Sequence, residues 1–244
     1  MKYSIKVNEV RNGSENVRGI ASVTLGDSFK LNNITIVNDP REAGKVFVSM
    51  PSYKDSKEEY KSIFNPTTKE FHDELYDNIL GAFHELTENQ AKNSYTVEYN
   101  KNDSRMPDFN VRVTPYEREG SSIRGMASIS FNGLAVNNVT IHEGKEGKMF
   151  VSMPSYKTSQ IDDKGKPVYK DICHPVTAKF RDKLDNAILQ EYVNAREQAK
   201  TKDSVIDKLN EGKKAVAQKA SENKTKVRDA KSREHDQPDR SDAR

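Results

Sequence analysis

The sequence predicts an α+β protein made of two repeats, each an antiparallel β-sheet followed by one amphipathic α-helix, with a helical to disordered C-terminal tail. The octapeptide FVSMPSYK occurs at residues 47–54 and again at residues 150–157. The blocks that flank it recur in the same order. Within each copy, apolar residues first alternate with a period of two, which is typical of strands, and then recur every three or four residues, which is typical of a helix.

The repeat extends well beyond the octapeptide. RGIAS at residues 18–22 matches RGMAS at 124–128, and NITI at 33–36 matches NVTI at 138–141. Two copies make a duplicated domain and not a solenoid, which needs at least ~3 units to bury a continuous core. The chain is therefore divided into a first domain, a linker, a second domain and a charged tail, at residues 1–88, 89–106, 107–195 and 196–244.

The strands are predicted from alternation and from the frequency of β-branched residues. At the start of the chain, Tyr3, Ile5 and Val7 alternate with polar residues. The fourth strand should end at Pro51 or lie at a sheet edge, because proline cannot donate a hydrogen bond to a ladder. The expected strands are residues 3–10, 17–25, 29–37 and 46–50 in the first repeat, and residues 109–115, 123–131, 134–141 and 148–153 in the second.

A helix is expected after the strands of each repeat. Thr67 and Glu70 have the spacing of a capping box, which satisfies unpaired backbone amides at a helix start. Beyond Tyr192, sequence rich in alanine and lysine predicts that the second helix continues, and from about Ser221 we expect disorder because almost nothing is left to bury. The predicted apolar stripes are Phe71, Leu75, Ile79, Phe83 and Leu86 in the first helix, and Phe180, Leu184, Ile188 and Tyr192 in the second.

Composition narrows the class of protein. Cys173 is the one cysteine, so no intrachain disulfide can form and a reducing cytoplasm is the expected setting. No apolar stretch approaches membrane-spanning length, and we expect no membrane association. The formal net charge is +3, and residues 196–244 hold 14 Lys and Arg against 10 Asp and Glu, so the basic excess lies in the tail. Such a bias permits nucleic-acid binding without requiring it.

The sequence contains no recognisable catalytic or metal-binding pattern. Its five histidines form no closely spaced ligand pair, and one cysteine is too few for the usual zinc sites. Residues 144–148 have the wrong spacing for a phosphate-binding loop, and residues 162–165 lack the alternating oxygen ligands of a calcium loop. We expect both segments to be turns, and we expect no enzyme activity, no metal and no cofactor.

The repeated MPSYK segment is the first candidate binding site. Proline ends a strand there, and a hydroxyl, an aromatic ring and a lysine follow beside a loop that contains further lysines, including Lys170 in the second repeat. Tyr53 with Lys54, and Tyr156 with Lys157, can together contact a phosphate and stack on a base. The alternative interpretation is a strand end with solvated lysines.

The start of each helix is the second candidate. Lys69 in the first repeat, and Lys179, Arg181 and Lys183 in the second, lie on the polar side of the predicted helix. Unpaired backbone amides at a helix N-terminus also favour an anion. The alternative is an ordinary solvated helix face.

Four spaced blocks of the second repeat carry a family resemblance: RGMASIS at residues 124–130, NVTI at 138–141, FVSMPS at 150–155 and YKDICHPV at 169–176. In these blocks the chain closely resembles SpoVG, a family of bacterial septation regulators. The resemblance spans about residues 109–192 and, more loosely, residues 3–86. It implies a small α+β fold that dimerises through its sheet and binds DNA and RNA to regulate gene expression, with roles in sporulation, division and virulence programmes.

The sequence departs from the family pattern in three ways. Family members usually have two basic residues after MPS, whereas here Tyr53 and Tyr156 precede the single Lys54 and Lys157. The first repeat has FNPT at residues 64–67 where the second has CHPV. Ordinary members carry one domain, so two in tandem resemble a homodimer fused into one chain. We expect an intramolecular pseudo-dimer, because each repeat alone is small and leaves a sheet edge open.

The leading hypothesis is a cytoplasmic, non-enzymatic regulator that binds DNA, RNA or both and acts in bacterial gene expression, septation or sporulation. The alternative is a protein-interaction module of a division or regulatory complex that does not bind nucleic acid directly. Salt-sensitive binding of a mixed DNA and RNA pool distinguishes the two. The predicted nucleic-acid contacts are Tyr53, Lys54, Lys69, Tyr156, Lys157, Lys170, Lys179, Arg181 and Lys183.

Overall fold

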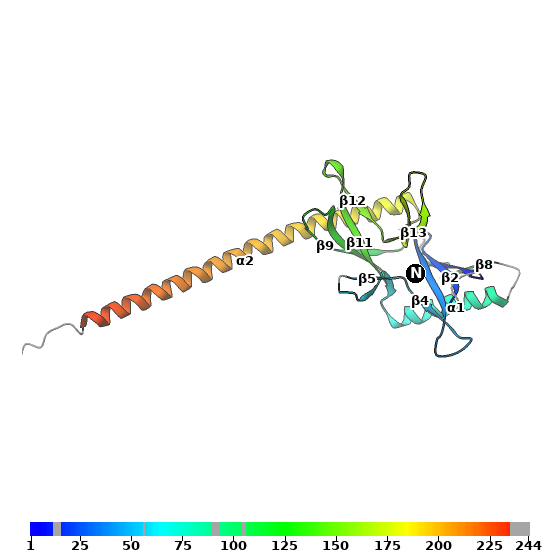
Figure 1. Cartoon of the computed structure of the whole chain (residues 1–244), viewed down its shortest axis with the longest axis horizontal. Helices are drawn as coiled ribbons and strands as arrows, with labels where there is room; N and C mark the ends of the chain where they lie inside the picture. The colour runs from blue at the N-terminus through cyan, green and yellow to red at the C-terminus, as the bar shows by residue number, and fades with distance from the viewer. Residues whose placement is uncertain (12–15, 56, 89–92, 104–105, 235–244) are drawn as a thin grey trace, which may run out of the picture. The chain divides into compact units, whose positions relative to one another are not determined.

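The first repeat forms an antiparallel sheet at the predicted positions (Figure 1). The computed structural model describes residues 1–11, 16–55, 57–88, 93–103 and 106–234. Strands β1 and β2 pair in register, with Ile5 opposite Val23, and both side chains are buried. The strands of this repeat are β1 (Tyr3–Glu9), β2 (Val17–Leu25), β3 (Phe29–Asn38) and β4 (Val46–Ser49).

The second repeat builds an equivalent sheet in the order β12-β11-β10-β9. A 3-10 turn, η1 (Lys145–Gly147), joins its last two strands, and the amide of Gly144 donates to the carbonyl of Lys148 at 2.8 Å. The predicted turn at residues 144–148 is therefore confirmed. The strands are β9 (Phe109–Pro115), β10 (Ile123–Phe131), β11 (Leu134–Glu143) and β12 (Met149–Ser152).

Each sheet is covered on one face by the helix of its own repeat. Helix α1 (Lys69–Glu88) buries Leu75, Ile79, Phe83 and Leu86, as the spacing predicts, while Phe71 is half-buried. The predicted capping box at Thr67 is wrong by one residue. The hydroxyl of Thr68 accepts a hydrogen bond from the amide of Phe71 at 3.3 Å, and Thr177 does the same for Phe180 at 3.2 Å.

Helix α2 (Ala178–Glu234) is longer than the helix of the first repeat. Its first turns bury Phe180, Leu184, Ile188 and Tyr192, as predicted. Residues 1–195 form one compact unit and residues 196–244 a second. The helix extends past the transition expected near Ser221, and residues 235–244 lie outside the described residues.

The two repeats exchange strands. Strand β15 (Cys173–Pro175) of the second repeat pairs with β3 of the first, and β7 (Phe64–Pro66) of the first pairs with β11 of the second. The two contacts are equivalent, because the amide of Asn32 donates to Ile172 at 2.7 Å and the amide of Asn137 donates to Ile63 at 2.6 Å. Sequence analysis predicted neither strand.

The exchange explains the repeated pair of asparagines. Asn33 on β3 and Asn138 on β11 both adopt φ 61°. At these residues the pairing of β3 with β2, and of β11 with β10, shifts its register. Asparagine tolerates this left-handed conformation better than most residues. The preceding residues, Asn32 and Asn137, donate side-chain hydrogen bonds to the exchanged segments. Their acceptors are the carbonyls of Asp171, at 3.3 Å, and Ser62, at 3.4 Å.

The exchange also produces a shared core. The ring of Phe29 in the first repeat lies 5.0 Å from the ring of Phe131 and 6.3 Å from that of Phe180, both in the second repeat. All three side chains are buried. Aromatic pairs at these separations add to the free energy gained by burial alone, so this contact stabilises the pairing of the repeats.

A strand, β8 (Ser94–Tyr99), lies within the segment predicted as a linker. It pairs antiparallel with β1 and extends the first sheet beyond the repeat. Tyr95, Val97 and Tyr99 are half-buried and alternate with exposed residues. This period-two pattern was present in the sequence but was obscured by the polar residues on either side.

Each octapeptide leads from the sheet into a separate hairpin. Pro51 and Pro154 follow β4 and β12, and the chain then re-enters extended conformation, which was not predicted from the sequence. The turn predicted at residues 162–165 is confirmed, with the amide of Gly165 donating to Asp162 at 2.9 Å. The hairpins are β5 (Ser52–Lys54) with β6 (Tyr60–Ser62), and β13 (Ser155–Ile161) with β14 (Pro167–Asp171).

We expect that a side chain cannot be added at Gly19 without strain, and that one can be added at Gly81. A Cβ on Gly19 would lie 3.0 Å from the Phe83 ring and 3.3 Å from the carbonyl of Asn8, while one on Gly81 meets nothing within 4 Å. We expect Gly19→Ala to lower the free energy of unfolding by about 1–3 kcal/mol through overpacking. As the matched control, Gly81→Ala should raise it by roughly 0.5–1 kcal/mol, because alanine favours a helix. Urea denaturation followed by circular dichroism measures both, and equal effects would contradict the packing argument.

We expect the chain to be a monomer in solution. The exchanged strands β7 and β15 occupy edges of β3 and β11 that would otherwise be open to another chain. Light scattering at low micromolar concentration should give the mass of one chain, 27.7 kDa. A dimer that persists on dilution would show that these contacts also form between chains.

Candidate functional site

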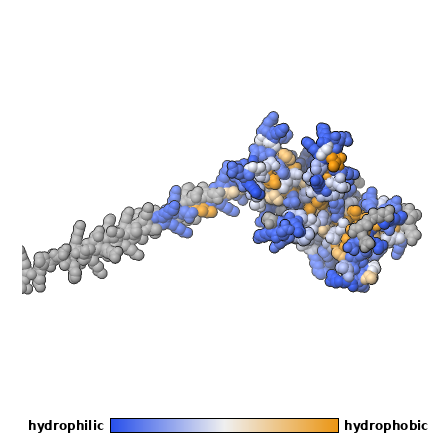
Figure 2. Space-filling view, in the orientation of Figure 1, coloured by the Kyte–Doolittle hydropathy of each residue, from blue (hydrophilic) through white to orange (hydrophobic). Residues whose placement is uncertain are grey.

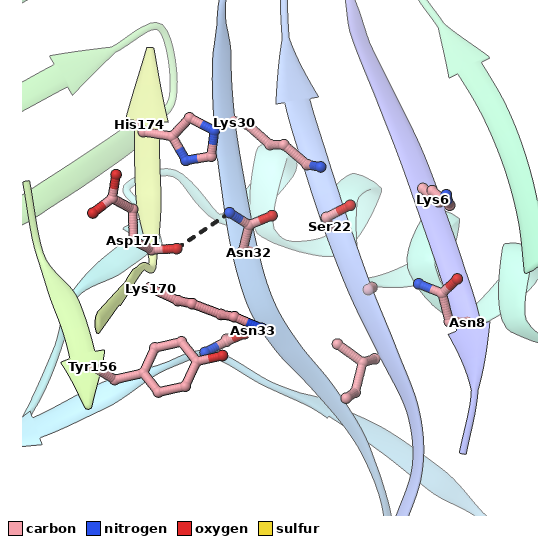
Figure 3. A pocket seen from close by; sticks show the side chains of 12 residues that line it. Lys6, Asn8, Ser22, Lys30, Asn32, Asn33, Tyr156, Lys170, Asp171 and His174 are labelled. Carbon is pink, nitrogen blue, oxygen red and sulfur yellow. Dashed lines mark hydrogen bonds between the residues drawn. The ribbon is translucent and has the colours of Figure 1, made fainter. Parts of the chain in front are cut away.

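A polar cleft lies where the first sheet meets the second repeat. Its volume is about 450 Å³, and strands β1, β2 and β3 line one side while β13, β14 and β15 line the other (Figure 3). Because Ile5 and Val7 are buried under α1, alternation places Lys6 and Asn8 on the opposite face of β1, toward the cleft. The lining residues are Lys6, Asn8, Ile20, Ala21, Ser22, Lys30, Asn32, Asn33, Tyr156, Lys170, Asp171 and His174.

Three lysines give the cleft its positive charge. Lys6 and Lys30 come from the first repeat and Lys170 from the second. Figure 3 shows Lys30 beside His174 and the side chain of Lys170 extending toward Asn33. Within the described ranges, none of these lysines forms an ion pair. Asp171 is the acidic residue among those that line the cleft, so the lysines outnumber it.

His174 lines the cleft from strand β15. Burial lowers the pKa of its imidazole, and the positive charges of Lys30 and Arg181 lower it further, while Asp171 opposes them. Its Nδ1 atom is buried and has no hydrogen-bond partner among the described residues. Burial therefore favours the neutral form of the ring, and Nδ1 is shielded from the open part of the cleft.

The neighbouring Cys173 has a structural role. It is fully buried at the junction of β15 with β3, and burial raises the pKa of its thiol to about 12. A thiol of this kind is neither a nucleophile nor a redox sensor at neutral pH. Its side chain contributes to the shared core instead.

In the second repeat, the hairpin separates the predicted contacts onto two faces. Tyr156 and Lys170 are opposite each other on β13 and β14, and both line the cleft. Lys157 is exposed and lies opposite Tyr169, on the other face of the hairpin. The tyrosine and lysine of MPSYK therefore point to different faces, because neighbouring strand residues alternate.

In the first repeat, the predicted lysines are paired with carboxylates. Lys54 contacts Glu58 at 2.8 Å and lies 5.5 Å above the Tyr60 ring. Lys69 is paired with Asp73 one helical turn later, and this hydrogen bond raises the pKa of the lysine. Tyr53 is half-buried against the core. These residues are less available to an anion than those of the cleft.

The predicted helix-start residues of the second repeat also separate. Arg181 is half-buried and near enough to His174 to lower its pKa, but it is not among the residues that line the cleft. Lys183 lies 5.3 Å above the Phe109 ring, and its ammonium group contacts the sulfur of Met106 at 4.0 Å. Lys179 is exposed.

Sequence analysis did not identify Lys6, Lys30 or His174 as site residues. Alternation along β1 could have placed Lys6 on the polar face. The proximity of Lys30 to His174 could not have been predicted, because it depends on the exchange of β15, whose register sets these two residues opposite each other. Tyr169, 61% exposed, and Tyr60, 72% exposed, occupy equivalent positions in the two hairpins and were not predicted as stacking surfaces.

Figure 2 shows hydrophilic residues over most of the visible face of the compact unit, with small hydrophobic patches between them. In the described part of the chain, no three His, Cys, Asp or Glu residues are grouped as metal ligands. No helix there is long and apolar enough to cross a bilayer.

The perturbed pKa of His174 predicts a pH effect on stability. Because the folded pKa is below the ordinary value of about 6.5, the stability linked to this group is complete above that pH and is lost as the pH falls through the folded pKa. His174→Asn, which copies Asn65 at the equivalent position, should make the fall in Tm between pH 7 and pH 5 shallower. His84→Asn, at an exposed position of α1, is the control. An identical pH profile for wild type and His174→Asn would contradict the burial argument.

Comparison with known proteins identifies the family of both repeats. The SpoVG family profile matches twice, at residues 1–85 and 106–194. The SpoVG septation protein of Thermoanaerobacter sp. (strain X514) is 38% identical over 89 residues, which cover 36% of this chain and 88% of that protein. That of Caldanaerobacter subterraneus subsp. tengcongensis is 36% identical over 94 residues, or 38% of this chain and 94% of that protein.

The SpoVG septation protein of Treponema denticola is 38% identical over 82 residues, which cover 33% of this chain and 76% of that protein. Each of these relatives is thus matched over most of its length by about one repeat of this chain. Strand β8 lies between the two segments that match the family. The chain belongs to the SpoVG family and carries its domain twice, in tandem.

Proposed function

We propose that the chain is a cytoplasmic, non-enzymatic regulator of septation or sporulation that binds DNA, RNA or both through the cleft between its repeats. The observation that carries this proposal is the group of three lysines, from both repeats, that face one cleft without ion pairs in the described part of the chain. The regulatory process is proposed from the relatives, which are named septation proteins.

The charge arrangement suits a phosphate backbone. Lys6 and Lys30 are on strands separated by β2, and Lys170 approaches from the hairpin of the second repeat. Lysines spread over a concave surface can contact successive phosphates, and each contact releases condensed counterions from the nucleic acid. An interaction of this kind fixes position and supplies affinity but does not read sequence.

The uncharged residues of the cleft suit a base. The Tyr156 ring lies beside Asn33 in Figure 3 and offers a surface for stacking. Asn8 and Asn33 carry amide groups that both donate and accept hydrogen bonds, as base edges do. Lysines together with a stacking ring and hydrogen-bonding amides favour nucleic-acid binding over a role in protein binding alone.

A salt titration tests the proposal. Fluorescence anisotropy with labelled DNA and RNA pools should show binding that weakens with salt. Lys30→Ala combined with Lys170→Ala should reduce the slope of log affinity against log salt by about 2 for duplex DNA, and somewhat less for single strands. As the control, Lys179→Ala combined with Lys157→Ala removes the same charge outside the cleft. Its slope should stay steeper than that of the cleft variant.

A chain that ends at Ala195 tests the other basic segment. Residues 1–195 form a compact unit, so this truncation removes the tail without entering the unit. If the tail is a nonspecific anchor, its loss should weaken binding to all sequences alike. Total loss on truncation, with an unchanged slope in the double Lys→Ala variant, would place binding in the tail. Absence of binding to any nucleic acid would favour the protein-interaction alternative.

A further inference from the structure

The internal symmetry of the compact unit gives every cleft residue an equivalent in the other repeat. The cleft is formed by the first sheet with hairpin β13–β14. The equivalent surface, which we call the reciprocal surface, is the outer face of the second sheet with hairpin β5–β6. The strand registers show which residues are equivalent. His174 lies opposite Lys30, and Asn65 lies opposite Ala135, so Asn65 is the equivalent of His174 and Ala135 that of Lys30. In the same way, Tyr156 is opposite Lys170 as Tyr53 is opposite Lys61.

The reciprocal surface lacks part of the charge of the cleft. Ala135 stands where the cleft has Lys30, and Asn65 stands where it has His174. Arg112 keeps the positive charge of Lys6, since both residues are opposite a serine of the repeated RG-x-A-S block. The cation next to the exchanged strand is therefore present in one half of the molecule and absent from the other.

The hairpin lysine of the reciprocal surface is neutralised. Lys61, the equivalent of Lys170, lies 2.7 Å from Glu59 and 3.9 Å from Asp55. Lys54, the equivalent of Lys157 on the other face of the hairpin, is also paired, with Glu58. An anion would have to compete with these carboxylates, at a cost that it would not meet at Lys170, which forms no ion pair within the described ranges.

The shape of the cleft limits the ligand. A volume of about 450 Å³ suits a small ligand or one unit of a chain, with the lysines around it. A base within a duplex is stacked and cannot reach Tyr156 or the asparagine amides on this sheet face. An unpaired base can, and single-strand binding proteins combine a basic groove with aromatic stacking in this way.

We propose that the duplication has left one working site per chain, and that the cleft of Lys6, Lys30 and Lys170 takes a single-stranded segment while the reciprocal surface takes none. This inference rests on the proposed function. It differs from that function in predicting an asymmetric molecule, in which the two repeats have unequal roles at the surface despite a common fold.

Two variants of the full chain with equal charge changes test the asymmetry. The first replaces Lys6, Lys30 and Lys170 by Ala. The control, matched in charge, replaces Arg112 and Lys61 of the reciprocal surface and Lys54 of its hairpin by Ala. A labelled single strand of about six nucleotides, the size range of one binding fold, is the ligand. Calorimetry should give one oligonucleotide per wild-type chain. The cleft variant should lose about tenfold in affinity and about 2 in salt slope, while the control stays near wild type.

Each result decides between the proposals. Equal losses in the two variants, or two oligonucleotides per chain, would overturn the single-site inference and leave the proposed function standing. No binding by wild type to single strands or duplexes would overturn both. Equal affinity for a duplex of the same sequence would overturn the single-strand assignment. If circular dichroism shows that the cleft variant is unfolded, Lys30→Ala with His174→Asn replaces it, since these residues already occupy the equivalent positions in the other repeat.

Discussion

The exchange of β7 and β15 between the repeats is the interaction on which the rest of the compact unit depends. Each exchanged strand is only three residues long, yet it sets the neighbouring hairpin against the sheet of the other repeat. Val176 and Thr67 extend the pairing by donating backbone hydrogen bonds to Ser28 and Gly133. Without the exchange, Lys170 and His174 would have no fixed relation to Lys6 and Lys30, and no cleft would form.

The identity of the two octapeptides follows from the same constraint. Each runs from an edge strand, through a proline, into a hairpin. The carbonyl of Pro51 accepts a hydrogen bond from Ile63 at 2.9 Å, and that of Pro154 accepts one from Ile172 at 2.8 Å, immediately before the exchanged strands. The segment therefore directs the chain toward the other repeat. Its repetition is explained by the fold, and the residues that differ around it, such as Lys30 and Ala135, are better candidates for function than those that are identical.

Elements defined by interactions between residues close in sequence were predicted, whereas those defined by distant partners were not. The bounds of β2, β9 and β10 match the prediction, because alternation is local and the buried face imposes it. Strands β7 and β15 were missed because three residues show no period, and their partners lie far away in the sequence. Thr68 was missed as the cap because Thr67 offered a matching glutamate at the expected spacing. Of the predicted contacts, Tyr156 and Lys170 line the cleft, whereas Lys54 and Lys69 were already paired with carboxylates that sequence reasoning had not weighed.

Fusion of two domains into one chain changes what the site can become. A one-domain chain that pairs with itself must carry the same residue at both equivalent positions, so any carboxylate that neutralises one lysine neutralises both. In the tandem chain, Glu59 can pair with Lys61 while Lys170 remains unpaired within the described ranges, and Lys30 can face His174 while Ala135 faces Asn65. The core residues are bound by the shared packing and stay alike. The surface is under no such constraint, and this freedom is the physical basis for a molecule that is symmetric in fold and asymmetric in charge.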